Sequence, residues 1–159
     1  MAPLHWVVGR FAAMPAVARW AAVVAEMAIL WWLSSGPIGG LHASPWRAFL
    51  HNAAHVVAYS AMGAMALLAI CGEARASARK RLAAVALAAA YGAVDELHQR
   101  YVPGRAAAWS DFGSDLFGAM LGVAIVLWLR HGEHASWRHV LVALALGIGC
   151  SALGTFTAW

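Results

Sequence analysis

The sequence predicts an all-α protein, a polytopic bundle of about five transmembrane helices that forms one domain over residues 1–159. Only 11% of the residues are Asp, Glu, Lys or Arg, against roughly 25% in soluble domains. Hydrophobic residues make up 63% of the chain. A bilayer crossing needs about 20 mostly apolar residues, and the sequence contains five apolar blocks of about this length. Each block must be helical, because lipid offers no hydrogen-bond partners to an open backbone.

The five blocks are separated by turn-forming or charged residues. The first ends at the Ser-, Gly- and Pro-rich run 34–40, which is typical of a turn. The third block has an obvious apolar part only to Val94, but we expect its helix to continue to Gln99. Most of the nine tryptophans fall near the predicted span ends, where the headgroup layer favours amphipathic rings. The predicted spans are 17–33, 48–71, 82–99, 111–129 and 140–158.

The distribution of Lys and Arg predicts the orientation of the chain. The connections on one side carry Arg10, Arg19, Arg75, Arg79, Lys80, Arg81, Arg130 and Arg138. Those on the other side carry only Arg47, Arg100 and Arg105. The side richer in cations faces the cytoplasm, so we expect a cytoplasmic N-terminus and an outward-facing segment 95–105. Because these cations separate apolar blocks, we predict no nucleic-acid partner despite a net charge of +4.

Polar residues of three predicted spans converge on the outer side. His51, His55 and Tyr59 recur every four residues and therefore share one helix face. At the end of the third span, spacings of four and three residues place Gln99 beside Asp95 and Glu96.

The start of the fourth span carries two more acids, Asp111 and Asp115, on one face. Gly118 and Gly122 continue that face, and small residues at this spacing let helices approach closely. Glu26 in the first span lies deeper, where a carboxylate costs several kcal/mol unless it is protonated or paired. Its candidate partners are His51, His55 and Arg105.

The loop between the third and fourth spans contains a turn signal. In Pro103-Gly104 the proline fixes φ and the glycine supplies a positive φ, as a type II turn requires. Such a turn would return Arg105 over the helix ends, where its guanidinium could bind a carboxylate of the protein or a phosphate from outside.

Each of these features also has a structural explanation. The histidines can be hydrogen-bonding core residues, Asp111 can cap a helix, and Glu96 with Arg105 can form an ion pair. The number of ionisable groups favours a site, because such residues are expensive within spans and usually functional. The predicted catalytic or binding residues are Glu96, Gln99, Arg105, Asp111, Asp115, His55 and Tyr59, with Asp95, His51 and Glu26 in support. We predict no cofactor; the alternative is a divalent metal held by His55, Glu96, Asp111 and Asp115.

The same residues resemble the signature of the VanZ-like membrane proteins. The resemblance rests on the run 95–105, on Asp111, Asp115 and Gly118, and on His55 followed by Tyr59. It covers roughly residues 52–122. Where the family usually has Asp-Lys ahead of the histidine, this chain has His51 and Asn52, so a role for that acid or base is not carried over.

The resemblance implies a multi-span protein of the bacterial cell (plasma) membrane, in a family named for a link to resistance against the glycopeptide teicoplanin. It supplies no mechanism. The favoured hypothesis is a protein that binds an anionic or lipid-linked envelope component, with membrane lipids and a lipid-linked cell-wall precursor as expected partners. The alternatives are a membrane-embedded hydrolase or transferase with Glu, Asp and His as acid and base, and a small transporter or proton relay. Nothing in the sequence predicts an oligomeric state.

Overall fold

A computed structural model describes residues 2–36, 44–103, 109–131 and 134–156. Within these ranges the chain is helical and contains no strand, which confirms the predicted all-α class. Five of the helices coincide with the five predicted spans to within a few residues at most ends. The helices are α1 (Ala2–Ala13), α2 (Ala16–Ser34), α3 (Pro45–Cys71), α4 (Ala78–Gln99), α5 (Trp109–His131) and α6 (His134–Phe156).

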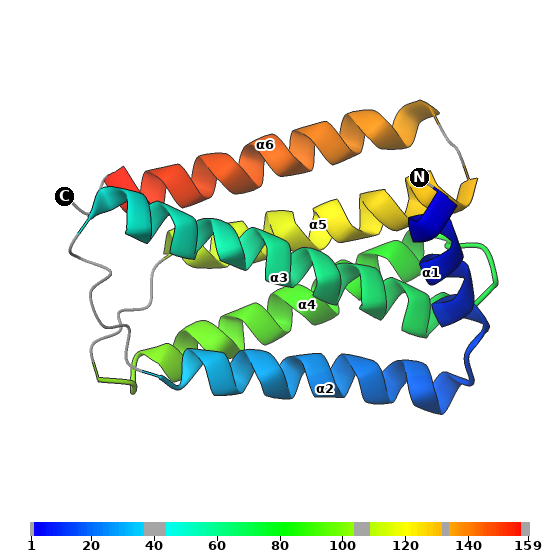
Figure 1. The fold of residues 1–159 in the computed structure, drawn as a ribbon, viewed down its shortest axis with the longest axis horizontal. Helices are drawn as coiled ribbons and strands as arrows, with labels where there is room; N and C mark the ends of the chain where they lie inside the picture. The colour runs from blue at the N-terminus through cyan, green and yellow to red at the C-terminus, as the bar shows by residue number, and fades with distance from the viewer. Residues whose placement is uncertain (1, 37–43, 104–108, 132–133, 157–159) are drawn as a thin grey trace.

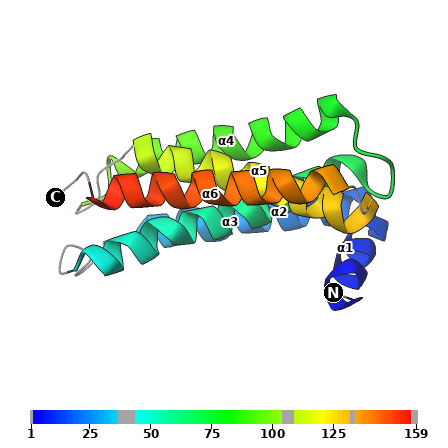
Figure 2. The same ribbon diagram turned by 90° about the horizontal axis from the view of Figure 1, so that it is seen from above.

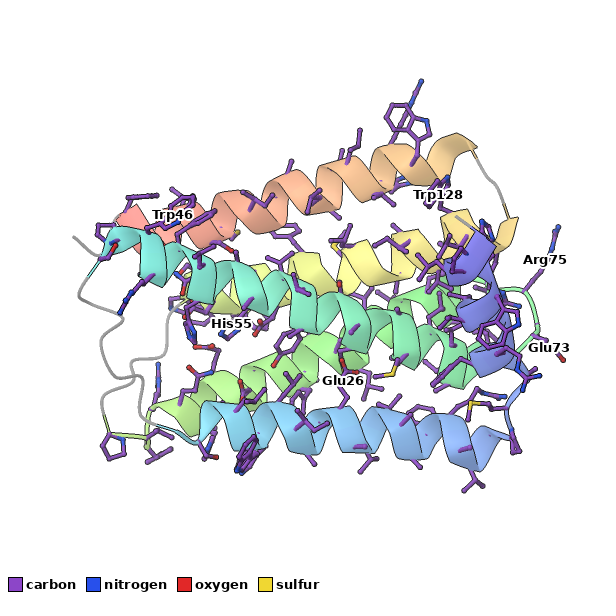
Figure 3. The ribbon with its side chains drawn as sticks, viewed as in Figure 1. Glu26, Trp46, His55, Glu73, Arg75 and Trp128 are labelled. Carbon is purple, nitrogen blue, oxygen red and sulfur yellow. The ribbon has the colours of Figure 1, made fainter. Side chains whose placement is uncertain are left out.

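Four of these helices, α2, α3, α5 and α6, are long and apolar enough to cross a membrane. They lie roughly along one direction, and α4 lies along the same direction (Figure 1). The 22 residues of α4 reach about 33 Å at 1.5 Å per residue, and its charged residues gather near its two ends. Exposed Trp46 and partly buried Trp128 lie at opposite ends of the bundle (Figure 3). These features agree with a membrane bundle of about five spans.

Helix α1 was not predicted. It lies across the end of the bundle and projects from it, unlike the other helices (Figures 1 and 2). Val8 and Ala12 pack into the core, while Trp6 and Val7 are exposed, and the guanidinium of Arg10 lies 5.7 Å from the Trp6 ring centroid. Twelve residues are too few to span a bilayer, so a search for long apolar blocks passes over such a helix.

A side chain of α5 holds the connection between α3 and α4 in place. Gly72 ends α3 with a φ of 54°, a conformation that glycine adopts without strain. The guanidinium of Arg130 donates to the carbonyl oxygens of Gly72 and Glu73, at 2.8 and 2.5 Å. The largest hydrophobic cluster surrounds this end of the bundle and includes Val8, Leu67 and Val126. The polar groups described below lie at the opposite end.

The two central helices, α3 and α5, touch through their backbones. A Cβ atom built on Gly122 would lie 1.8 Å from the carbonyl oxygen of Ser60, and one on Gly118 would lie 2.7 Å from that of Val56. Across the same contact, a Cβ on Gly63 would meet the backbone of Ala119 at 2.3 Å. The predicted close packing through Gly118 and Gly122 is therefore confirmed, and it sets the distance between the polar side chains on these helices.

Candidate functional site

The polar face of α3 has the predicted arrangement. The rings of His51 and His55 meet edge to face with centroids 5.5 Å apart, and those of His55 and Tyr59 lie parallel at 6.3 Å. Tyr59 is almost fully buried, whereas His55 keeps 11% of its side chain exposed. The three side chains therefore form one column that runs from the end of α3 into the bundle.

His55 is paired with a carboxylate from α5. Its Nδ1 forms a hydrogen bond 2.9 Å long with Oδ1 of Asp115, whose side chain is completely buried. The close crossing of α3 and α5 brings the two residues together. Asp111 and Asp115 share one face of α5, and Asp115 lies one turn further from the helix start. Asp115 is buried and Asp111 is only partly buried. The bond to Nδ1 leaves Nε2 of His55 as the ring nitrogen for other contacts.

Gly92 on α4 gives Asp115 and Tyr59 the room they occupy. A Cβ on Gly92 would lie 2.9 Å from Oδ2 of Asp115 and 3.2 Å from Cε1 of Tyr59. Within the described part of the chain, that Oδ2 and the Tyr59 hydroxyl have no hydrogen-bond partner although both atoms are buried. Gly92 was not among the predicted site residues, although it lies one turn before Glu96 on the same buried face of α4.

The end of α4 is bonded to α2. Gln99 donates to Oδ2 of Asp95 at 3.0 Å, and the hydroxyl of Ser34 donates to Oδ1 of the same carboxylate at 2.5 Å. The rings of Trp31 and His98 stack with centroids 3.8 Å apart. The predicted proximity of Gln99 and Asp95 is confirmed. Ser34 was missed as a site residue because its place in a Ser- and Gly-rich run indicated only a turn.

A cavity of about 280 Å³ lies between α2, α3 and α4 at this end of the bundle. Its lining has two chemical parts. The apolar part consists of Leu30, Leu33, Ala54 and Ala58. The polar part consists of Ser34, His51, His55, Tyr59, Asp95 and Gln99.

Behind the cavity, three ionisable residues from three helices converge. One nitrogen or oxygen atom from each of His55, Glu96 and Asp115 lies within 4.8 Å of the corresponding atoms of the other two. Glu96 is 7% exposed and Asp115 is not exposed at all. Three of the four residues named for a possible metal therefore lie together, whereas Asp111 is not in this group.

The structure does not describe Arg105, and it places Glu26 outside the cavity lining. Arg105 and Gly104 lie outside the described residues, so the predicted turn and its return of Arg105 stay predictions. Glu26 does not line the cavity and lies nearer the middle of the bundle than His55 (Figure 3). Its Oε2 has no partner among the described residues, so the expected pairing of Glu26 with His51 or His55 is not seen there.

A second polar region, which was not predicted, joins α6 to α3 and α5. The hydroxyls of Ser114 and Ser151 lie 3.1 Å apart, and the amide of Asn52 donates to the hydroxyl of Thr155 at 3.2 Å. Ser151 and Thr155 are fully or almost fully buried. The amide side chain of Asn52 within an apolar span was the feature of the sequence that could have indicated this region. Such groups hold membrane helices together, and we assign these residues to helix packing.

Comparison with protein families decides which family the chain belongs to. The sequence profile of the family described as VanZ/LLP1 matches residues 5–130, which include every helix that lines the cavity. The chain belongs to the VanZ/LLP1 family. The resemblance drawn from the motif is thereby confirmed. A search of curated proteins and a search of solved structures found no match. The α6 helix of this VanZ/LLP1 protein lies beyond the matched region.

Proposed function

We propose that this VanZ/LLP1 protein binds the polar end of an amphipathic cell-envelope component, an anionic or lipid-linked molecule, in the cavity between α2, α3 and α4. The two-part lining of the cavity carries the proposal. Leu30 and Leu33 can contact the first carbons of a lipid chain, while Ser34, His51 and Gln99 can form hydrogen bonds with its polar end. Ligand sites commonly combine an apolar lining with a few placed polar groups.

The loose packing of α2 supports a ligand that arrives from the bilayer. Only 6% of the residues in the most apolar stretch of α2 are buried, against 50% in α3 and 61% in α5. A lipid could therefore keep its chain in the membrane beside α2 and place its headgroup in the cavity. Arg105 remains the predicted contact for an anionic headgroup. If the ligand is a lipid-linked cell-wall precursor, its retention would affect susceptibility to glycopeptides such as teicoplanin.

Filling the cavity should displace the ligand. Ala54 lines the cavity and is itself exposed, so Ala54→Trp blocks the space without displacing buried atoms. We expect the lipid that is enriched with the wild-type protein to fall at least several-fold in this variant. The measurement is mass spectrometry of lipids that co-purify with the protein extracted in native membrane particles.

The matched control is Ala61→Trp, on an exposed position of the same helix outside the cavity. It should retain the enriched lipid, and Arg105→Ala should lose an anionic one. A lipid profile that is the same in wild type and both tryptophan variants, and equal to that of the bulk membrane, would refute ligand binding.

The hydrogen bond between His55 and Asp115 favours a second candidate function, a hydrolase or transferase acting on a lipid-linked substrate. A buried carboxylate that bonds Nδ1 orients the imidazole and leaves Nε2 for proton transfer. Since His55 also lines the cavity, its ring is within reach of a bound headgroup. In this hypothesis His55 is the general base or acid and Asp115 positions it.

The substitution Asp115→Asn distinguishes the binding function from the enzymatic one. For an enzyme, the variant should convert a lipid-linked substrate at least about 100-fold more slowly, because loss of such a carboxylate disturbs the tautomer of the histidine. Lipid retention should change little. The measurement is the time course of product formation in membrane particles, with retention measured on the same sample. Equal product formation by wild type and variant would exclude this role for Asp115.

A further inference from the structure

We infer that His55, Glu96 and Asp115 form a binding site for one divalent metal ion, behind the cavity and between α3, α4 and α5. It takes up the alternative of a divalent metal that the sequence left open, with Asp111 left out of the ligand set. It concerns an ion held by the chain itself, so it stands whether or not a lipid occupies the cavity. The observation that carries it is the convergence of one ligand atom from each residue to within 4.8 Å of the others.

The donor set suits a transition metal. Imidazole nitrogen and carboxylate oxygen are ligands of Zn²⁺ and Fe²⁺, and carboxylates also favour Mn²⁺. A tetrahedral ion with donors at about 2.1 Å needs them about 3.4 Å apart. Nδ1 of His55 and Oδ1 of Asp115 are 2.9 Å apart, and all three donor atoms lie within 4.8 Å of one another. Side-chain rotations can bring donors at these distances to the spacing that the ion needs. Three protein ligands leave one position open, as in catalytic rather than structural zinc sites.

The burial of the group also suits a cation. Glu96 and Asp115 are 7% and 0% exposed, and buried carboxylates are stable when they are paired or bound to a metal. A divalent ion would contribute positive charge to this group of carboxylates.

An unused ligand atom points to the same place. Oδ2 of Asp115 has no hydrogen-bond partner within the part of the chain that the structure describes, although buried polar atoms nearly always have one. This oxygen lies against Gly92 on α4, and Glu96 follows one turn later on that helix. An ion between the three helices would give Oδ2 a partner.

The ion would also place a positive charge beside the polar wall of the cavity. Phosphate headgroups bind such ions directly, as phosphates do in many enzyme sites. This last link, unlike the metal site itself, rests on the proposed function.

The test is the metal content and metal affinity of the full-length protein, purified in detergent without a polyhistidine tag. We expect about one Zn²⁺ or Mn²⁺ per chain by elemental mass spectrometry. After removal of metal by a chelator, calorimetric titration with each ion should show binding. Glu96→Gln should weaken it at least about 100-fold, because loss of groups that merely support metal ligands already costs 10–100-fold.

The matched control is Glu73→Gln, the same substitution at an exposed residue on the opposite end of the bundle (Figure 3), and it should bind like wild type. A variant is compared only if its elution profile and circular dichroism match those of wild type. The absorption spectrum of bound Co²⁺ gives a readout on the wild type alone, since ligand-field bands report nitrogen and oxygen donors. Absence of bound metal in wild type, or unchanged affinity in folded Glu96→Gln, would overturn the site. Lipid retention is measured separately, so its loss would leave this result unaffected.

Discussion

Gly122→Ala is expected to force α3 and α5 apart and to lower the free energy of unfolding by at least about 1–3 kcal/mol. The added methyl carbon would lie 1.8 Å from the carbonyl oxygen of Ser60 and 2.9 Å from the backbone nitrogen of Ala64. Both are backbone atoms, so no side-chain rotation relieves the overlap and a whole helix must shift. The measurement is unfolding in mixed micelles by increasing detergent denaturant, followed by circular dichroism.

Gly149→Ala is the matched control for this prediction. A Cβ at Gly149 meets nothing within 4 Å, and alanine is the better helix former, so stability should stay equal or rise. If Gly122→Ala unfolds at the same denaturant concentration as Gly149→Ala, the close crossing of α3 and α5 is wrong.

His55→Leu is expected to cost about 3–5 kcal/mol of unfolding free energy, because removing one partner leaves a buried carboxylate uncompensated. Oδ1 of Asp115 would lose its 2.9 Å hydrogen bond, and Oδ2 already has no partner in the described part of the chain. Unfolding is measured in mixed micelles with a chelator present, so that a bound metal does not contribute. His5→Leu, at an exposed position of α1, serves as the control and should have little effect.

The double variant His55→Leu/Asp115→Leu should recover most of the lost stability. Replacing both members of a buried pair with apolar residues is often neutral or stabilising. A double variant that is destabilised far less than the sum of the two single variants would show that the pair adds little net stability. Additive losses from the two substitutions would contradict this expectation.

Spacing along the chain was enough to predict what lies on one helix. The four-residue periods of His51, His55 and Tyr59 needed only the helix repeat, and Gln99 met Asp95 for the same reason. The pairing of His55 with Asp115 across two helices was not fixed by spacing. It depends on how α3 and α5 rotate against each other, and the glycine contacts decide that rotation.

Other parts of the site had weak or misleading signals in the sequence. Glu26 was expected to join the outer polar cluster because a deep carboxylate needs a partner, but its position one turn below Leu30 on α2 places it away from the cavity lining. Gly92 has no side chain to suggest a role, although its lack of a Cβ makes room for Asp115. Ser34 looked like a turn residue, and its bond to Asp95 became visible only when α2 and α4 were placed together.

The two sides of the cavity differ in how firmly they are held. His55 and Tyr59 lie on α3, whose backbone is in contact with α5, whereas only 6% of the residues in the most apolar stretch of α2 are buried. We therefore expect a ligand to enter or leave the cavity by displacing α2 rather than α3. Association rates and residence times would then depend on breaking the contacts of Trp31 and Ser34 with α4. Substitutions at these two positions should change the kinetics of exchange more than the chemistry of recognition.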